Sequence, residues 1–208
     1  MVTAAPRRPA HFETTEVRVD KFVVGPFDNN VFLIRDRGSG EAVIVDAANE
    51  HDLLVPLARA TGVRRVLTTH GHWDHIQAVT AMRDAGIEVA VAAADAAMLP
   101  AYDDTIDDEQ VITVGSLRIR CLHTPGHTPG STSFLVEGTP LLLTGDTLFP
   151  GGVGNTSWDY SSFTEIIGSV ERRLLTLPPD TLVLPGHGLD TTIGTERPHL
   201  DAWVARGW

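Results

Sequence analysis

Hydrophobic residues recur along this chain with two different periods. Near the N-terminus, short runs rich in β-branched residues occupy positions 17–24, 29–36 and 41–47, and turns rich in Gly, Asp and Asn separate them. Such runs bounded by turn-forming residues are typical of β-strands. The pattern therefore predicts that the chain opens with a β-meander.

Further along the chain, the pattern changes to helix followed by strand. Residues 52–62 place apolar side chains on one helical face and end at Gly62, and the apolar run 63–69 follows. The same order recurs at 75–86, which predicts a helix, and at 87–93, which predicts a strand. Alternating helices and buried strands indicate an α/β fold.

A third helix is predicted late in the chain. Residues 161–177 carry apolar side chains at helical spacing, and Ser162 and Glu165 form a capping-box pattern at the start. In contrast, residues 102–110 contain five acidic side chains, and we interpret them as a solvated loop between a helix and a strand.

The length of the chain is compatible with one domain. Its 208 residues are 42% hydrophobic, which suffices for one sizeable core. Residues 1–14 lack periodicity and are predicted to form a flexible tail, and residues 15–208 are predicted to form the domain. We expect two mixed sheets flanked by helices.

Charge and cysteine content exclude several classes of function. The formal net charge of −11 disfavours binding to nucleic acid or to anionic membranes, so we expect a small-molecule substrate. No apolar run is long enough for a signal peptide or a membrane span, and the single cysteine, Cys121, fits a reducing compartment as a small buried residue. We therefore expect a cytoplasmic protein, whose oligomeric state the sequence does not specify.

The residues that suggest chemistry follow directly on apolar runs. The runs continue into "THGHWDH", "HTPGHT", "TGDT" and "LPGHG", so four strand ends are expected to deliver side chains to one place. In the first motif, alternation along an extended segment would point His70, His72 and Asp74 the same way and His75 aside. One short loop could thus serve two metal ions.

Imidazole and carboxylate groups in this number suit a pair of divalent ions such as zinc. The candidate ligands are His70, His72, Asp74, His75, His127, Asp146 and His187. Any single histidine is more often an ordinary surface or core residue, and we interpret His11, His51 and His199, which lie outside the motifs, in this way. His123, four residues before His127, is assigned a supporting role.

The motifs "THGHWDH", "HTPGHTPGS", "GDTLF" and "PGHG", in this order, resemble those of the metallo-β-lactamase superfamily and, within it, the glyoxalase II-like hydrolases. The resemblance implies a four-layer αββα sandwich of the α/β (α+β) class. It also implies that one metal ion binds His70, His72 and His127, that the other binds Asp74, His75 and His187, and that Asp146 bridges them.

The resemblance further implies hydrolysis of a thioester or related acyl substrate, as in hydroxyacylglutathione hydrolases. Two divalent ions, zinc with iron or manganese as alternatives, would supply a bound hydroxide at neutral pH, and Asp74 would orient this nucleophile. Asp46, at the end of a strand, would hold a ligating histidine by its other ring nitrogen or serve as a turn residue.

The sequence departs from the glyoxalase II pattern after "GDTLF", where it reads "PGGVGNTSWDY", so Trp158 and Tyr160 are candidates to line a different substrate loop. Glutathione as the carrier thiol is therefore left open. Two other enzymatic functions remain open: a persulfide dioxygenase with one iron on His70, His127 and Asp146, and a lactonase. Nucleic-acid processing and a non-catalytic binding module are disfavoured by the acidic charge and by the full ligand set.

Overall fold

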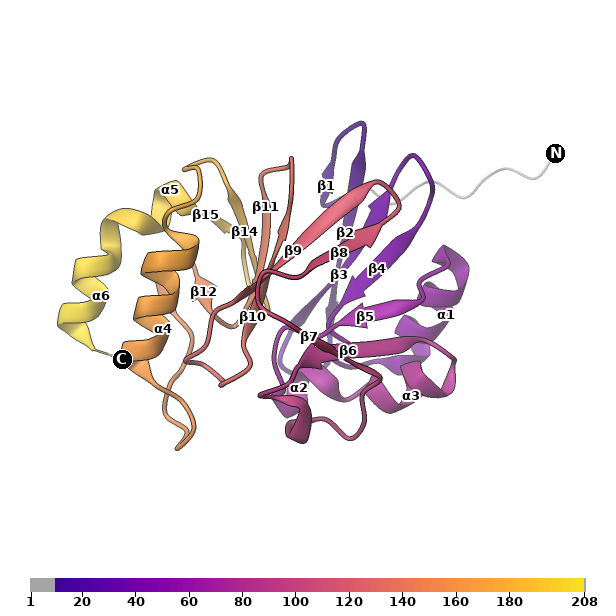
Figure 1. Cartoon of the computed structure of the whole chain (residues 1–208), viewed down its shortest axis with the longest axis horizontal. Coiled ribbons are helices and arrows are strands. Elements are labelled where there is room, and N and C mark those ends of the chain that lie inside the picture. The colour runs from indigo at the N-terminus through magenta and orange to yellow at the C-terminus, as the bar shows by residue number, and fades with distance from the viewer. Residues whose placement is uncertain (1–9, 208) are drawn as a thin grey trace.

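The computed structural model describes residues 10–207, which form two β-sheets packed face to face with helices on both outer sides (Figure 1). The αββα sandwich expected from the sequence is confirmed. Seven strands form the first sheet, in the order β1 (Phe12–Glu13), β2 (Val17–Val24), β3 (Asn29–Asp36), β4 (Ala42–Val45), β5 (Arg65–Leu67), β6 (Glu88–Ala92) and β7 (Asp104–Ile106).

The second sheet contains six strands, in the order β15 (Thr191–Thr192), β14 (Leu182–Pro185), β11 (Leu141–Gly145), β10 (Thr132–Val136), β9 (Leu117–His123) and β8 (Val111–Val114). A separate hairpin joins β12 (Leu148–Phe149) to β13 (Gly152–Val153). Both large sheets are mixed, since β4 to β7 run parallel to one another in the first, and β11 and β14 do so in the second.

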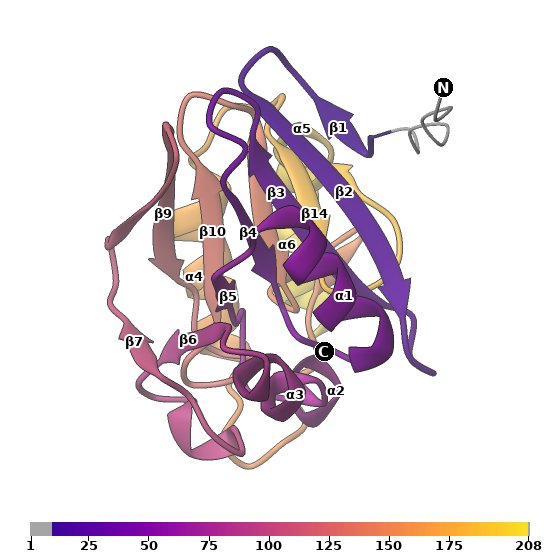
Figure 2. The ribbon, with the colours of Figure 1, turned by 90° about the vertical axis from the view of Figure 1, so that its right-hand side faces the viewer.

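Short helices cover the outer faces of the sheets. They are α1 (His51–Thr61), α2 (Trp73–Ile76), α3 (Val79–Asp84), α4 (Phe163–Ser169), α5 (Ile193–Glu196) and α6 (Leu200–Arg206), with 3₁₀ turns η1 (Ala96–Met98) and η3 (Arg197–His199) and a π-helical turn η2 (Val170–Leu174). Figure 2 shows α1 and α3 lying over the first sheet, and Figure 1 shows α4 and α6 on the far side of the second. No helix within residues 10–207 is long and apolar enough to cross a membrane.

Alternation along the strands divides the buried side chains between the layers. In β3, Phe32 and Ile34 pack between the two sheets, whereas Val31 and Leu33 pack beneath α1 and α3. In the second sheet, Leu142 of β11 likewise faces outward, toward η2 and α6. Each fully buried side chain of this size stabilises the fold by about 1.5–3 kcal/mol, so the strands that lead to the candidate ligands are held on both faces.

The helix predicted over residues 75–86 is interrupted in the structure. The amides of Gln77 and Ala78 donate to the carbonyl oxygens of Ala48 and Ala47, at 3.0 and 2.9 Å. Because these two donors bond to the segment after β4, α2 ends at Ile76 and α3 starts afresh. The capping interaction predicted for α4 is confirmed, since the Ser162 hydroxyl accepts from the amide of Glu165.

Two segments predicted to be irregular contain short strands, β7 and β1. Within the acidic segment 102–110, β7 pairs with β6 and buries Ile106 in the core between the sheets. The tail predicted over residues 1–14 lies outside the described residues as far as residue 9, and the prediction is wrong at Phe12, which pairs with Val19 in β2. In both segments a single apolar side chain packs against the core and outweighs the polar surroundings.

Candidate metal centre

The seven candidate ligands meet at one end of the sandwich, and both sheets contribute to them. The first sheet supplies β5, whose end leads to His70 and His72. In the second sheet β11 and β14 run parallel, with Leu143 opposite Leu184, so their ends bring Asp146 and His187 to the same edge. The remaining ligands come from the loop between β9 and β10 and from α2.

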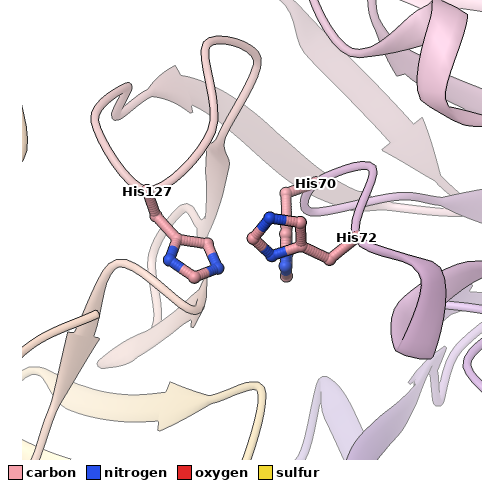
Figure 3. A group of neighbouring side chains, drawn as sticks. All are labelled: His70, His72 and His127. Carbon is pink, nitrogen blue, oxygen red and sulfur yellow. The ribbon is translucent and has the colours of Figure 1, made fainter. Parts of the chain in front are cut away.

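His70, His72 and His127 form the first of two clusters. One ring nitrogen from each residue lies within 4.8 Å of the others. Figure 3 shows the ring of His127, which comes from one loop, facing those of His70 and His72, which come from another. Three imidazoles around a common space are a ligand set that zinc uses in catalytic sites.

The hydrogen bonds around this cluster leave nitrogen lone pairs facing its centre. His127 donates from Nδ1 to the carbonyl oxygen of Asn155 at 2.7 Å, so its Nε2 carries the lone pair. The hydroxyl of Thr69 donates to Asp46 and therefore accepts from Nδ1 of His70, at 3.0 Å. The Nε2 atoms of His70 and His127 are buried without a hydrogen-bond partner, as expected of atoms that bind a metal ion.

The second cluster contains an unfavourable contact unless a cation lies within it. His75 donates from Nδ1 to Asp46 at 2.9 Å, and His187 donates from Nδ1 to the carbonyl oxygen of Phe27 at 2.9 Å. Both Nε2 atoms therefore carry lone pairs when the rings are neutral, yet they lie 3.1 Å apart. A proton or a metal ion relieves this repulsion.

Asp74 completes the second cluster. Its Oδ2 lies 3.3 Å from Nε2 of His187 and 3.6 Å from Nε2 of His75, and it accepts a hydrogen bond from Nδ2 of Asn29 at 2.9 Å. Asn29 lies at the start of β3 and is buried, and no motif in the sequence indicated its position here. The carboxylate of Asp74 is thus held against both histidines.

Asp146 connects the two clusters. Its Oδ1 lies 3.5 Å from Nε2 of His75, and its Oδ2 lies 3.6 Å from Nε2 of both His127 and His187. Oδ1 is buried and has no hydrogen-bond partner. These distances fit a carboxylate that shares two ions, and the donor set as a whole fits a pair of divalent cations.

The first cluster keeps its histidines neutral, as metal ligands must be. Burial lowers the pKa of His72 to about 4, with a further contribution from His127. The pKa values of His70 and His127 are also lowered, in both cases mainly by burial. These rings therefore offer lone pairs at neutral pH.

The second cluster attracts positive charge. Burial opposes a charge on His75, but Asp146 and Asp46 outweigh it and raise the pKa of His75 to about 9. The pKa of His187 is raised for the same reason, chiefly by its contact with Asp74 after the opposing effect of burial. Burial likewise opposes the charge on Asp74, yet its contacts with His187 and His75 hold the pKa of Asp74 below its usual range.

The backbone of the first motif differs from the extended run predicted for it. His72 is extended and precedes α2, so Asp74 and His75 lie on a single helical turn. The prediction that Asp74 points the same way as His70 and His72 is wrong, because Asp74 joins the cluster of His75 and His187. Because of this helical turn, His70 and His72 belong to the first cluster, and Asp74 and His75 belong to the second.

Asp46 lies where the sequence suggested. One of its oxygens accepts from Nδ1 of His75, and the carboxylate also accepts from the amide and hydroxyl of Thr69, at 2.7 and 2.8 Å. Its backbone is left-handed, with φ of 64°, a conformation that is uncommon outside glycine. Asp46 therefore orients a candidate ligand from a constrained turn.

Trp158 and Tyr160 lie against the first cluster. The hydroxyl of Tyr160 is 2.9 Å from Nε2 of His72, which leaves Nδ1 of His72 for a metal ion. The ring of Trp158 lies with its centroid 4.4 Å from that of His72 and 5.5 Å from that of His127. Both aromatic residues can therefore contact a substrate bound at the first cluster.

Asp95 is a buried residue of the centre that the sequence analysis missed. Its carboxylate accepts from the amide of Gly71 at 2.8 Å, from the hydroxyl of Thr128 at 2.6 Å and from the amide of Gly130 at 2.6 Å. It thus joins the loop of His70 and His72 to the loop of His127. Asp95 follows the apolar strand β6, so the strand-end pattern used for the ligands was also present here.

The remaining histidines and the cysteine lie outside both clusters. His11 pairs with Asp190 at 2.6 Å, and His51 and His199 are exposed. His123 contacts the carbonyl oxygen of Ile106 at 3.2 Å, so it supports β7 and no candidate ligand. Cys121 is buried in the core, as expected from the sequence, and burial raises the pKa of its thiol to about 12.

Gly186 brings the backbone close to the side chains of two candidate ligands. A Cβ atom here would lie 2.2 Å from Oδ1 of Asp146 and 2.8 Å from Cε1 of His75. We expect Gly186→Ala to displace both ligands and to weaken metal affinity by about 10–100-fold, measured by competition with a chelating dye. Gly38→Ala, whose Cβ would lie 3.5 Å from its nearest neighbour, is the matched control and should leave the affinity unchanged. Equal affinities for the two variants would contradict the packing argument.

Curated relatives of the chain include enzymes named hydroxyacylglutathione hydrolase. One from Cereibacter sphaeroides is 36% identical over 162 residues, which cover 77% of this chain and 62% of the relative. The chain therefore spans less than two thirds of that enzyme. The relative from Haemophilus influenzae, hydroxyacylglutathione hydrolase GloC, is 29% identical over 203 residues and is covered over 95% of its length, with 87% of this chain.

Solved structures also match most of the chain. The BLEG-1 B3 metallo-beta-lactamase has a TM-score of 0.78 and 29% identity, over 87% of this chain and 97% of that one. A protein solved in a di-iron-bound form has a TM-score of 0.76 and 28% identity, over 85% of this chain and 96% of that one. ETHE1 from Myxococcus xanthus has a TM-score of 0.75 and 26% identity, over 88% of this chain and 82% of that one.

The family assignment agrees with the position of the candidate ligands. A profile of the metallo-beta-lactamase superfamily matches residues 24–187. This range begins at the end of β2 and ends at His187, so it includes all seven candidate ligands. The chain belongs to the metallo-beta-lactamase superfamily.

Proposed function

We propose that this protein is a metal-dependent hydrolase that holds two divalent ions, most favourably zinc, and cleaves a thioester or related acyl ester. The observation that carries the proposal is the pair of histidine clusters whose lone pairs face inward and share Asp146. The names of the relatives from C. sphaeroides and H. influenzae support the same class of substrate.

In this proposal, the ions are divided as the clusters are. His70, His72 and His127 would hold one ion, Asp74, His75 and His187 would hold the other, and Asp146 would contribute to both. When bound, such ions polarise a substrate carbonyl and lower the pKa of a water molecule to about 7.

The residues of the chain then have separate tasks. Asp74 stays ionised and can accept a hydrogen bond from the attacking water, which positions it for the acyl carbon. Asp46 and the carbonyl oxygen of Phe27 fix the rings of His75 and His187 through their Nδ1 atoms. In the overall reaction, water supplies a hydroxyl to the acyl carbon and a proton to the leaving thiol or alcohol.

Metal content and activity test this proposal together. We expect the purified protein to bind two zinc ions per chain and to hydrolyse simple thioesters, to lose activity on dialysis against a chelator, and to regain it with zinc. Elemental analysis and a thiol-release assay provide the measurements. Undiminished hydrolysis by the metal-free protein would refute the proposal, and a lactone in the same substrate series tests lactonase activity.

A persulfide dioxygenase with one iron on His70, His127 and Asp146 is the second candidate. Imidazole and carboxylate ligands also accept iron, and one similar structure is in a di-iron-bound form. A single ion on this triad leaves the Nε2 atoms of His75 and His187 to share a proton, whereas a second ion would also use the carboxylate of Asp74 beside them, which favours the hydrolase. Oxygen uptake with glutathione persulfide and one iron per chain would establish the second candidate; two zinc ions without oxygen uptake would reject it.

A further inference from the structure

Two pairs of exposed aromatic side chains flank the metal-binding clusters. In the first pair, the rings of Phe27 and Trp73 contact each other edge to face, with centroids 5.0 Å apart. In the second pair, Trp158 and Tyr160 lie parallel, with an interplanar angle of 3° and centroids 6.3 Å apart. We call these four side chains the aromatic rim.

Residues of the rim lie next to both clusters. Phe27 accepts the hydrogen bond from His187 through its carbonyl oxygen, and Trp73 lies between His72 and Asp74 in the motif. The second pair contacts the other cluster, where Trp158 packs on His72 and His127. Exposed aromatic residues therefore occur beside each cluster, through ring contacts at the first and through neighbouring backbone at the second.

The four side chains of the aromatic rim are exposed to solvent although they are largely apolar. Phe27 and Trp73 are 53% and 57% exposed, and Trp158 and Tyr160 are 39% and 43% exposed. Leu189, two residues after His187, is 80% exposed. Exposed apolar surface collected around a site indicates a binding function, because an apolar ligand removes it from water.

Two acidic residues are direct neighbours of rim residues in the chain. Asp28 follows Phe27, and Asp159 lies between Trp158 and Tyr160; both carboxylates are exposed. Lys21, the only lysine of the chain, is occupied by the carboxylate of Asp190 at 3.2 Å and by the carbonyl oxygen of Gly188 at 2.7 Å. Anionic groups of a substrate would be repelled at the rim.

We propose that the aromatic rim selects neutral thioesters or esters with an extended apolar acyl group and discriminates against anionic carriers such as glutathione. This inference rests on the proposed hydrolytic function and adds the class of substrate. The acyl chain lies against the rim while the carbonyl reaches the clusters. A neutral carrier is not repelled by the carboxylates of Asp28 and Asp159.

A matched substrate series tests the inference. Hexanoyl and acetyl thioesters are each prepared on N-acetylcysteamine, a neutral carrier, and on glutathione. We expect kcat/KM to be about tenfold higher for hexanoyl than for acetyl on the neutral carrier, and higher for the neutral than for the glutathione thioester by at least a similar factor. A preference for the glutathione thioesters would overturn the inference and leave the hydrolase proposal intact.

Variants of the rim identify the cause. Trp73→Ala should reduce the hexanoyl-to-acetyl ratio to about twofold, and Trp73→Phe should restore most of it. The double variant Asp28→Asn with Asp159→Asn should raise kcat/KM for the glutathione thioester. Val204→Ala, which removes an exposed apolar side chain on α6, is the control and should change neither ratio.

Binding measurements separate the inference from the proposed function. Non-hydrolysable thioethers of hexyl on both carriers are titrated against the metal-loaded protein, and tryptophan fluorescence is followed. Tighter binding of the neutral thioether supports the inference even if no substrate is hydrolysed, and equal or weaker binding overturns it. Sedimentation of Trp73→Ala provides the last readout, since a change in oligomeric state with unchanged acyl preference would assign the rim to contact between copies of the chain.

Discussion

Replacing Asp146 with alanine is expected to leave at most one tightly bound metal ion per chain and to lower kcat/KM for thioester hydrolysis at least about a thousandfold, since metal ions contribute several kcal/mol to stabilising the transition state. Asp146 is the residue whose carboxylate approaches histidines of both clusters, at 3.5 Å from His75 and 3.6 Å from His127 and His187. Without it, the clusters lose the ligand they share.

The measurements for Asp146→Ala are elemental analysis after gel filtration and steady-state kinetics. Asp201→Ala, which removes an exposed carboxylate on α6, is the matched control and should keep both metal and activity. His127→Ala should resemble Asp146→Ala, although it disturbs only the first cluster directly. Full activity of Asp146→Ala with two bound ions would show that the cluster geometry does not determine metal binding.

Replacing Asp95 with alanine is expected to weaken both folding and metal binding. The substitution leaves the amides of Gly71 and Gly130 without their acceptor, at about 1–3 kcal/mol for each buried group, and removes one partner of the Thr128 hydroxyl, which keeps the Ser131 hydroxyl at 2.8 Å. Because these groups belong to the two loops that carry the first cluster, metal affinity should fall about 10–100-fold. Asp95→Asn keeps one acceptor oxygen, so its stability and its metal affinity should lie between those of the unsubstituted protein and those of Asp95→Ala.

Asp36 provides a control of the same kind away from the metal centre. It is a buried carboxylate at the end of β3 that accepts from the amides of Ser116 and Gly38, at 2.9 and 3.1 Å. Asp36→Ala should lower the free energy of unfolding comparably, measured in urea, and leave metal affinity unchanged. The absorption spectrum of the cobalt-substituted protein should change only for the Asp95 variants. Identical behaviour of Asp95→Ala and Asp36→Ala toward metal would reduce Asp95 to a purely structural residue.

The sequence predicted the architecture and the candidate ligands because both depend on local patterns. Period-two alternation and short apolar runs marked most strands, and the residues after them, such as Asp46, Asp146 and His187, lie at the strand ends that meet. Strand alternation could not predict the helical turn at Asp74 and His75. The end of that turn depends on amides that bond to a segment distant in sequence.

The same reason explains the positions that the sequence did not reveal. Asp95 sits in an alanine-rich stretch, and its role depends on two loops far from it along the chain. The strand at Asp104–Ile106 exists because β6 offers a free edge and the core accepts Ile106. Contacts of this kind become apparent only when the sheets have been assembled.

The division of the ligands between the two sheets has a consequence for how the protein matures in the cell. The loop of His70 and His72 leaves the ribosome well before β11 and β14, which carry Asp146 and His187. No nascent chain can offer the full ligand set until its second sheet has formed. Metal ions that bind the assembled sandwich and not the unfolded chain would stabilise the folded state against unfolding and proteolysis by mass action. A shortage of metal would therefore shorten the lifetime of the protein and also lower its activity.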